Sequence, residues 1–207
     1  DELFAETAKA TMAKLVSDFD VKKAGDYYKV FSEGAKNRTI MMWMEDENEQ
    51  QLVKNAGCSG GLNYDSENPE TGVYFSISDP SKLGWFLDIN TEIGEPVVND
   101  DGTRTYEVKA TFGNALTSAD KINAGNYILG NYGGTITGYI HIFAPAGGTV
   151  SDFHASNGGA IHMGTYNGHQ VGYMFGNSIA PGRNIEVTYK VTTAAGVTTP
   201  LGVNSTP

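Results

Sequence analysis

The sequence predicts an α+β fold in which a helical N-terminal part, packed with a short strand, is followed by a mainly antiparallel, β-sandwich-like part. Apolar residues in the first third recur at three- and four-residue spacing, as on one face of a helix. From about Gly72 onward, the period changes to that of strands rich in aromatic and β-branched residues. The 26 glycines supply the tight turns that short strands need. We expect a helical part over 1–71, an antiparallel β part over 72–192 and a tail over 193–207.

Two amphipathic helices are expected near the N-terminus. The apolar stripe of the first consists of Phe4, Ala8, Met12, Leu15 and Phe19. The second helix places Val21, Ala24, Tyr28 and Phe31 on one side, with Asp20 as its N-cap and Gly34 as its end.

A short apolar run, Arg38–Met44, follows these helices and has the length of a strand. We expect it to be the buried strand of this half, with Trp43 in the core. Residues 45–57 then predict a further helix, because acidic side chains crowd its first turn and Gly57 can end it.

The strands of the β part are bounded by turn residues. Asn99 to Gly102 form a strong hairpin turn signal between two of them. The predicted strands cover 73–78, 85–93, 105–112, 135–144, 149–155, 160–166, 169–175 and 184–191. Short strands with turns every 8–12 residues are typical of an antiparallel sandwich. Residues 114–134 show no strand pattern, and the last dozen residues are expected to fray.

Composition excludes several classes of function. The net charge is −10, and the three arginines are scattered, which disfavours nucleic acid, anionic lipid and polyphosphate ligands. Cys58 is the single cysteine, so an internal disulfide is impossible, as fits a cytosolic or a Gram-positive surface protein. No apolar run approaches the length of a membrane span, and the chain opens at Asp1 without a signal peptide. We expect a soluble piece of a longer protein.

Four segments, 33–62, 71–88, 118–148 and 178–191, carry a family resemblance. The first reads as a strand and an acidic helix with a Gly-rich turn, and the second as a strand that follows a loop containing Lys82. The third contains a Tyr-x-x-Gly passage before a strand, and the fourth a closing Pro-Gly turn and strand. This pattern resembles the C-terminal half of the domain of unknown function 4012 family. The resemblance implies an actinobacterial surface protein anchored by an N-terminal membrane helix, often associated with surface polysaccharide production. It implies no activity and no functional residues.

The segment from Gly57 to Gly61 formally satisfies the G-x-S-x-G motif of serine hydrolases, with Ser59 as nucleophile. That motif needs a strand before the serine and a helix after it, whereas here a predicted helix precedes and a polar loop follows. The first histidine, His141, also lies downstream rather than upstream. We interpret the segment as a turn, with neither Ser59 nor Cys58 catalytic.

The four histidines and several carboxylates are the candidate metal ligands of the sequence. His141, His154, His162 and His169 lack ligand spacing, although His154 and His162 flank a turn and could face each other across two strands. The loop carboxylates match no calcium-binding frame; they are Asp65, Glu67, Glu70, Asp100 and Asp101. We expect no metal, no cofactor and no catalytic residue.

Aromatic residues raise the alternative of a carbohydrate-binding surface. Trp43 and Trp85 are expected in the core, Trp85 because it alternates with Leu83 and Leu87. Tyr127 and Tyr132 lie among loop glycines and are the aromatic cluster that best fits a ligand surface.

Three functions remain open on the sequence. The first is a non-catalytic extracellular surface module that scaffolds polysaccharide or cell-wall assembly. The second is part of an enzyme acting on cell-wall glycopolymer, with its catalytic residues in an absent N-terminal half. The third is a glycan-binding module, which a flat aromatic strip would favour. Expected partners are cell-wall or exopolysaccharide components or assembly proteins, without nucleic acid and without membrane contact by this piece.

Overall fold

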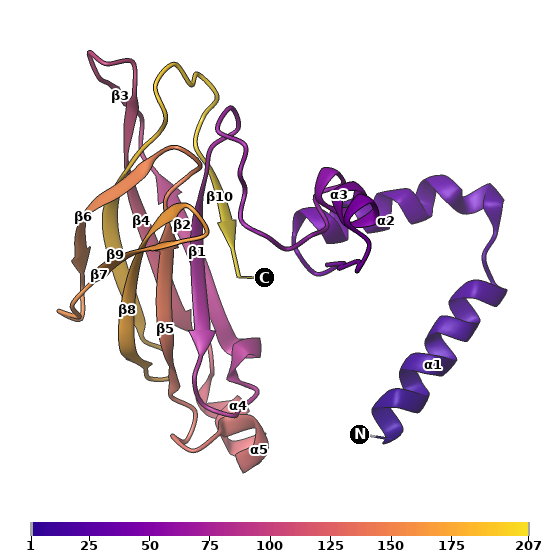
Figure 1. Cartoon of the computed structure of the whole chain (residues 1–207). Helices are drawn as coiled ribbons and strands as arrows, with labels where there is room; N and C mark the ends of the chain where they lie inside the picture. The colour runs from indigo at the N-terminus through magenta and orange to yellow at the C-terminus, as the bar shows by residue number, and fades with distance from the viewer. Residues whose placement is uncertain (1, 207) are drawn as a thin grey trace. The chain divides into compact units, whose positions relative to one another are not determined.

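The computed structural model describes residues 2–206 and has an α+β fold (Figure 1). The chain divides into two compact units after Gly61. The first holds three α-helices, and the second, Leu62–Thr206, holds the strands together with two short α-helices. No helix among the described residues is long and apolar enough to cross a membrane.

The helical unit contains the three expected α-helices. Their bounds are Glu2–Ser17 (α1), Ala24–Lys36 (α2) and Glu47–Asn55 (α3), with a 3-10 turn over Val21–Lys23 (η1). Asp46 caps α3 by accepting hydrogen bonds from the backbone N–H groups of Asn48 and Glu49. Asp20 caps η1 rather than α2. None of the described residues of α1 is buried, so its apolar stripe faces solvent.

Three predictions for the helical unit are wrong. Helix α2 does not end at Gly34 but continues to Lys36, and Gly34 is buried where a Cβ would lie 2.5 Å from the Ile40 side chain. Arg38–Met44 forms no strand, because no second strand of this unit lies beside it to complete a ladder. Trp43 is 76% exposed instead of buried.

The β unit is a sandwich of two sheets. One sheet, here called sheet A, contains β1 (Glu70–Ile77), β5 (Ile136–Phe143), β7 (His162–Tyr166), β8 (His169–Ile179) and β10 (Gly202–Ser205), in the order β10-β1-β5-β8-β7. The other, sheet B, contains β2 (Leu87–Ile93), β4 (Arg104–Asn114), β6 (Thr149–Ala155) and β9 (Asn184–Thr192), in the order β2-β4-β9-β6, with β3 (Val97–Val98) beside β4. All pairings except β1 with β10 are antiparallel.

The core lies between the two sheets. It is built from alternate residues of each strand, such as Ile140 and Ile142 from sheet A and Val187 and Val191 from sheet B, all at most 1% exposed. The alternation of inward apolar and outward side chains is what the sequence period of two requires.

The segment between β4 and β5 forms one end of the sandwich. It contains two short helices, α4 (Ser118–Asn123) and α5 (Asn126–Leu129), which lie at the lower end of the sheets in Figure 1 near the 3-10 turn η2 (Leu83–Phe86). The buried Asn114 side chain holds this end by donating to the carbonyls of Gly134 and Ile179 at 2.8 and 2.9 Å.

The expected frayed tail is also wrong. Val197 and Leu201 are 4% and 6% exposed, and they anchor a chain that adds β10 to the edge of sheet A. The backbone N–H of Gly202 donates to the carbonyl of Pro69. The tail is ordered because these two apolar side chains leave water and its backbone completes a parallel ladder with β1.

Candidate binding face

The outer faces of the two sheets differ in chemistry. The outer face of sheet B is polar and charged, as expected for a face in contact with water. It carries cross-strand ion pairs between Lys109 and Glu92 at 3.1 Å and between Lys190 and Asp152 at 2.8 Å. These pairs are exposed, so each adds little to stability, and they describe an ordinary solvated surface.

The outer face of sheet A is aromatic. Its outward side chains form what we call the aromatic face: Tyr74, Tyr139, His141, Phe143, His162, Tyr166, Tyr173 and Phe175. The four strands that carry these rings contain a single acidic residue, Glu70 at the start of β1, and neither lysine nor arginine. A contiguous apolar surface of this kind marks an interaction site more often than a solvated face.

The register of the strands places four of these rings in one row across the sheet. Tyr74 of β1 pairs with His141 of β5, His141 pairs with Tyr173 of β8, and Tyr173 pairs with His162 of β7. Because directly paired residues of neighbouring strands lie on the same side of a sheet, the row runs perpendicular to the strands.

Contacts between the rings extend the row into a surface. Tyr173 lies 4.9 Å from Phe175 and 5.8 Å from His162, centroid to centroid, and Phe175 lies 5.7 Å from Tyr139. On the other side of the row, Phe143 contacts Tyr74 at 5.8 Å and Tyr166 at 6.1 Å. These distances are in the range of favourable aromatic pairs, so the rings hold one another in place.

Two glycines leave space for the rings of Tyr74 and Tyr173 close to the backbone of the sheet. A Cβ at Gly72 would lie 2.7 Å from the Tyr74 ring, and one at Gly164 would lie 3.1 Å from the Tyr173 ring. The two tyrosine rings therefore cover backbone that has no side chain, and they lie against the sheet instead of standing upright.

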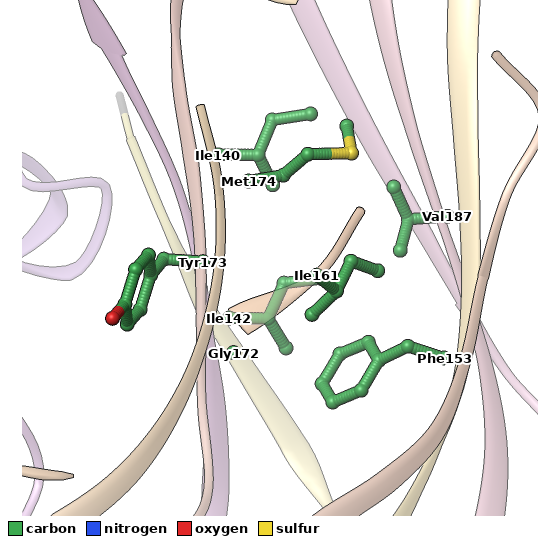
Figure 2. Close-up of a pocket in the computed structure, with 8 residues that line it drawn as sticks. All are labelled: Ile140, Ile142, Phe153, Ile161, Gly172, Tyr173, Met174 and Val187. Atoms are coloured by element: carbon green, nitrogen blue, oxygen red, sulfur yellow. The ribbon is translucent and has the colours of Figure 1, made fainter. Parts of the chain in front are cut away.

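The aromatic face is separate from the interior. Figure 2 shows Tyr173 pointing to the opposite side of β8 from Met174, away from the space between the sheets. Inside, the Phe153 ring packs on Gly172, where a Cβ would come within 2.6 Å of it. The space enclosed by these core residues does not admit a water molecule. A ligand therefore has access to the face but not to this part of the core.

Polar groups border the aromatic face at the β1 and β10 side. The hydroxyl of Tyr74 donates to Oδ1 of Asn204 at 3.1 Å, and the Asn204 amide donates to Glu70 at 3.4 Å. Burial among the rings lowers the pKa of His141, which favours its neutral imidazole. His169 lines the same hollow as Glu70 and Asn204, and Tyr64 contacts it edge-on at 4.8 Å.

The Gly57–Gly61 segment is a turn, as interpreted from the sequence. Helix α3 precedes it and a loop follows it directly, and Gly57 and Gly60 have positive φ angles of 71° and 64°. The Ser59 hydroxyl accepts a hydrogen bond from the N–H of Gly61 at 3.4 Å, and the buried Cys58 thiol contacts the carbonyl of Ala56. The strand-to-helix turn of a serine hydrolase is not formed by these residues.

The structure separates His154 from the other three histidines, which lie in sheet A. His154 lies in sheet B and His162 in sheet A, so they are not cross-strand neighbours, contrary to the alternative raised by the sequence. The chain leaves one sheet and enters the other between them. Among residues 2–206, no three His, Cys, Asp or Glu side chains gather in a way that could hold a metal ion.

The loop carboxylates have local structural roles. Asp65 accepts hydrogen bonds from Asn68 and from the N–H of Glu67, and Asp101 accepts them from the hydroxyl and N–H of Thr103. These bonds hold the pKa of both carboxyl groups below the usual value. Each carboxylate thereby stabilises its own turn.

The aromatic residues singled out from the sequence lie outside the aromatic face. Trp85 is 90% exposed, so its predicted core position is wrong. Tyr127, within α5, and Tyr132, just after it, are both exposed, and the Lys82 ammonium lies 5.3 Å from the centre of the Tyr127 ring. Both lie at the end of the sandwich formed by the segment between β4 and β5.

Sequence reasoning missed the aromatic face, although one signal for it exists. In β5, Tyr139, His141 and Phe143 alternate with Ile140 and Ile142, so both sides of this strand are apolar or aromatic. A strand in a two-layer sandwich needs only one apolar side. The surplus on the second side indicates an additional role.

A comparison of the chain with known protein families, curated proteins and solved structures finds no match.

Proposed function

We propose that this chain is a non-catalytic, extracellular surface module that binds glycan through the aromatic face of sheet A. The observation that carries the proposal is the row of Tyr74, His141, Tyr173 and His162 across four adjacent strands. Sugar rings present flat C–H surfaces and peripheral hydroxyls. Flat aromatic rings match the first, and tyrosine and imidazole polar atoms match the second.

The wider context of the proposal comes from the resemblance to the domain of unknown function 4012 family. That resemblance suggests a membrane-anchored protein of an actinobacterial surface, involved in polysaccharide or cell-wall assembly. In such a setting, a glycan-binding face would hold the polymer near its assembly proteins. The acidic charge of −10 would not oppose an uncharged polysaccharide.

A glycan array with the full chain, followed by calorimetry on the best ligand, tests the proposal. The decisive variants are Tyr173→Ala, in the row, and Phe175→Ala, which is 57% exposed beside it. We expect each to weaken binding by about 1 kcal/mol or more, the order of one aromatic stacking contact. Unchanged thermal unfolding would show that the loss does not come from misfolding.

Trp85→Ala and Tyr127→Ala serve as matched controls, because both remove exposed aromatic rings outside the aromatic face. We expect both variants to bind as the original chain does. If Tyr127→Ala abolished binding and Tyr173→Ala did not, the ligand surface would be the lower end of the sandwich, and the proposal for sheet A would be wrong.

A further inference from the structure

The geometry points to a particular ligand class for the aromatic face: an uncharged, extended glycan of equatorially linked pyranoses that lies across the strands, along the Tyr74–His141–Tyr173–His162 row. This inference rests on the proposed glycan-binding function and specifies its ligand and its direction of binding.

The direction follows from the spacing of the row. Neighbouring strands are about 4.8 Å apart. The backbones of Tyr74 and Tyr173, which are separated by β5, are therefore about 10 Å apart. One strand spacing is close to the length that one sugar occupies in an extended β-1,4-linked chain. Alternate sugars of such a chain would therefore meet Tyr74 and Tyr173, with the intervening sugar above β5.

The preference for a flat polymer follows from the orientation of the rings. Tyr74 covers Gly72 and Tyr173 covers Gly164, so both rings lie against the sheet. Equatorial linkages keep successive pyranoses in a ribbon whose flat sides carry C–H groups. An α-1,4-linked chain coils instead, and it could place only one or two of its sugars on such a surface.

The absence of charge in the ligand follows from the residues of the four strands. Glu70 is their single acidic residue, and they contain no lysine or arginine to pair with a carboxylate or phosphate. His141 lies at the centre of the row, where its ring nitrogens can hydrogen-bond with hydroxyls. An anionic polymer would also be repelled by the net charge of −10.

The test is calorimetry of the full chain with gluco- and chito-oligosaccharides from disaccharide to hexasaccharide. The row crosses four strands, so we expect affinity to rise with length up to about four sugars and then to level off. Tyr74→Ala, at one end of the row, should weaken tetrasaccharide binding about tenfold and move the plateau to shorter chains. An α-1,4-linked glucose hexasaccharide and a polyuronate of similar length are the ligand controls.

The outcomes separate this inference from the function on which it rests. If the α-linked hexasaccharide or the polyuronate bound at least as tightly as the β-linked series, with the same loss in Tyr173→Ala, the inference would be wrong and the glycan-binding function would stand. If affinity stopped rising at the disaccharide, the direction along the row would be wrong. Failure of every glycan on a broad array to bind would overturn both.

Discussion

Substitution of Gly72 by alanine should disturb the aromatic face while leaving the fold intact. The added Cβ would lie 2.7 Å from the Tyr74 ring and 3.1 Å from Cβ of Phe143. Carbon atoms in contact are at least about 3.5 Å apart, so the ring edge must move outward by about 0.8 Å. The ring belongs to a flexible side chain and can move, although its hydroxyl donates to Asn204. We expect Tyr74 to tilt away from the sheet.

The energetic consequences of Gly72→Ala differ between stability and binding. Alanine lowers the entropy of the unfolded chain, which favours folding by up to about 1 kcal/mol and offsets part of the cost of displacing the ring. Unfolding free energy in urea should therefore change by no more than about 1 kcal/mol, whereas glycan affinity should fall about tenfold.

Gly113→Ala is the matched control for this experiment. Gly113 also lies in a strand, β4 of sheet B, but its added Cβ would meet Asp88 at an ordinary 3.7 Å. We expect unchanged glycan affinity. Equal binding by Gly72→Ala and the original chain would refute the reasoning that the flat position of Tyr74 matters.

Three further predictions concern stability. Asn114→Ala removes the donors to the carbonyls of Gly134 and Ile179, and it should lower the unfolding free energy in urea by about 3 kcal/mol. Tyr106→Phe removes a buried hydroxyl without a hydrogen-bond partner among the described residues, and it should raise the melting temperature through a gain of about 1 kcal/mol. Because the folded chain lowers the pKa of His141, its contribution to stability is present above about pH 6.5 and is lost as the pH falls through the folded pKa. Melting curves of His141→Gln between pH 7.5 and 5 should accordingly depend less on pH.

The sequence predicted most strand positions because the period of two is a local property. Residues of β4 and β9, for example, alternate between buried and exposed over their whole length. The division into two sheets could not be predicted in the same way, because strand pairing joins residues far apart in the chain. His154 and His162 illustrate this limit, since a short turn separates them in sequence but places them in different sheets.

Both tryptophans were misplaced for a local physical reason. Leu83, Trp85 and Leu87 alternate as in a strand, but residues 83–86 form a 3-10 turn in which that alternation does not apply. Leu83 is fully buried while Trp85 is 90% exposed. Trp43 was misplaced because an apolar run of strand length becomes a strand only where a neighbouring strand can receive its hydrogen bonds.

The composition of the aromatic face also bears on the kind of partner it would meet. The outer face of sheet B, in the same domain, is an ordinary solvated face, with threonine, lysine and glutamate in cross-strand pairs. A permanent protein interface would instead be expected to resemble a domain core, rich in aliphatic side chains. The outward positions of β5 hold Tyr139, His141 and Phe143. Tyrosine and histidine tolerate water when the ligand is absent and provide hydrogen bonds when it is present. This mixture favours a reversible ligand with both C–H and hydroxyl groups over a second protein surface.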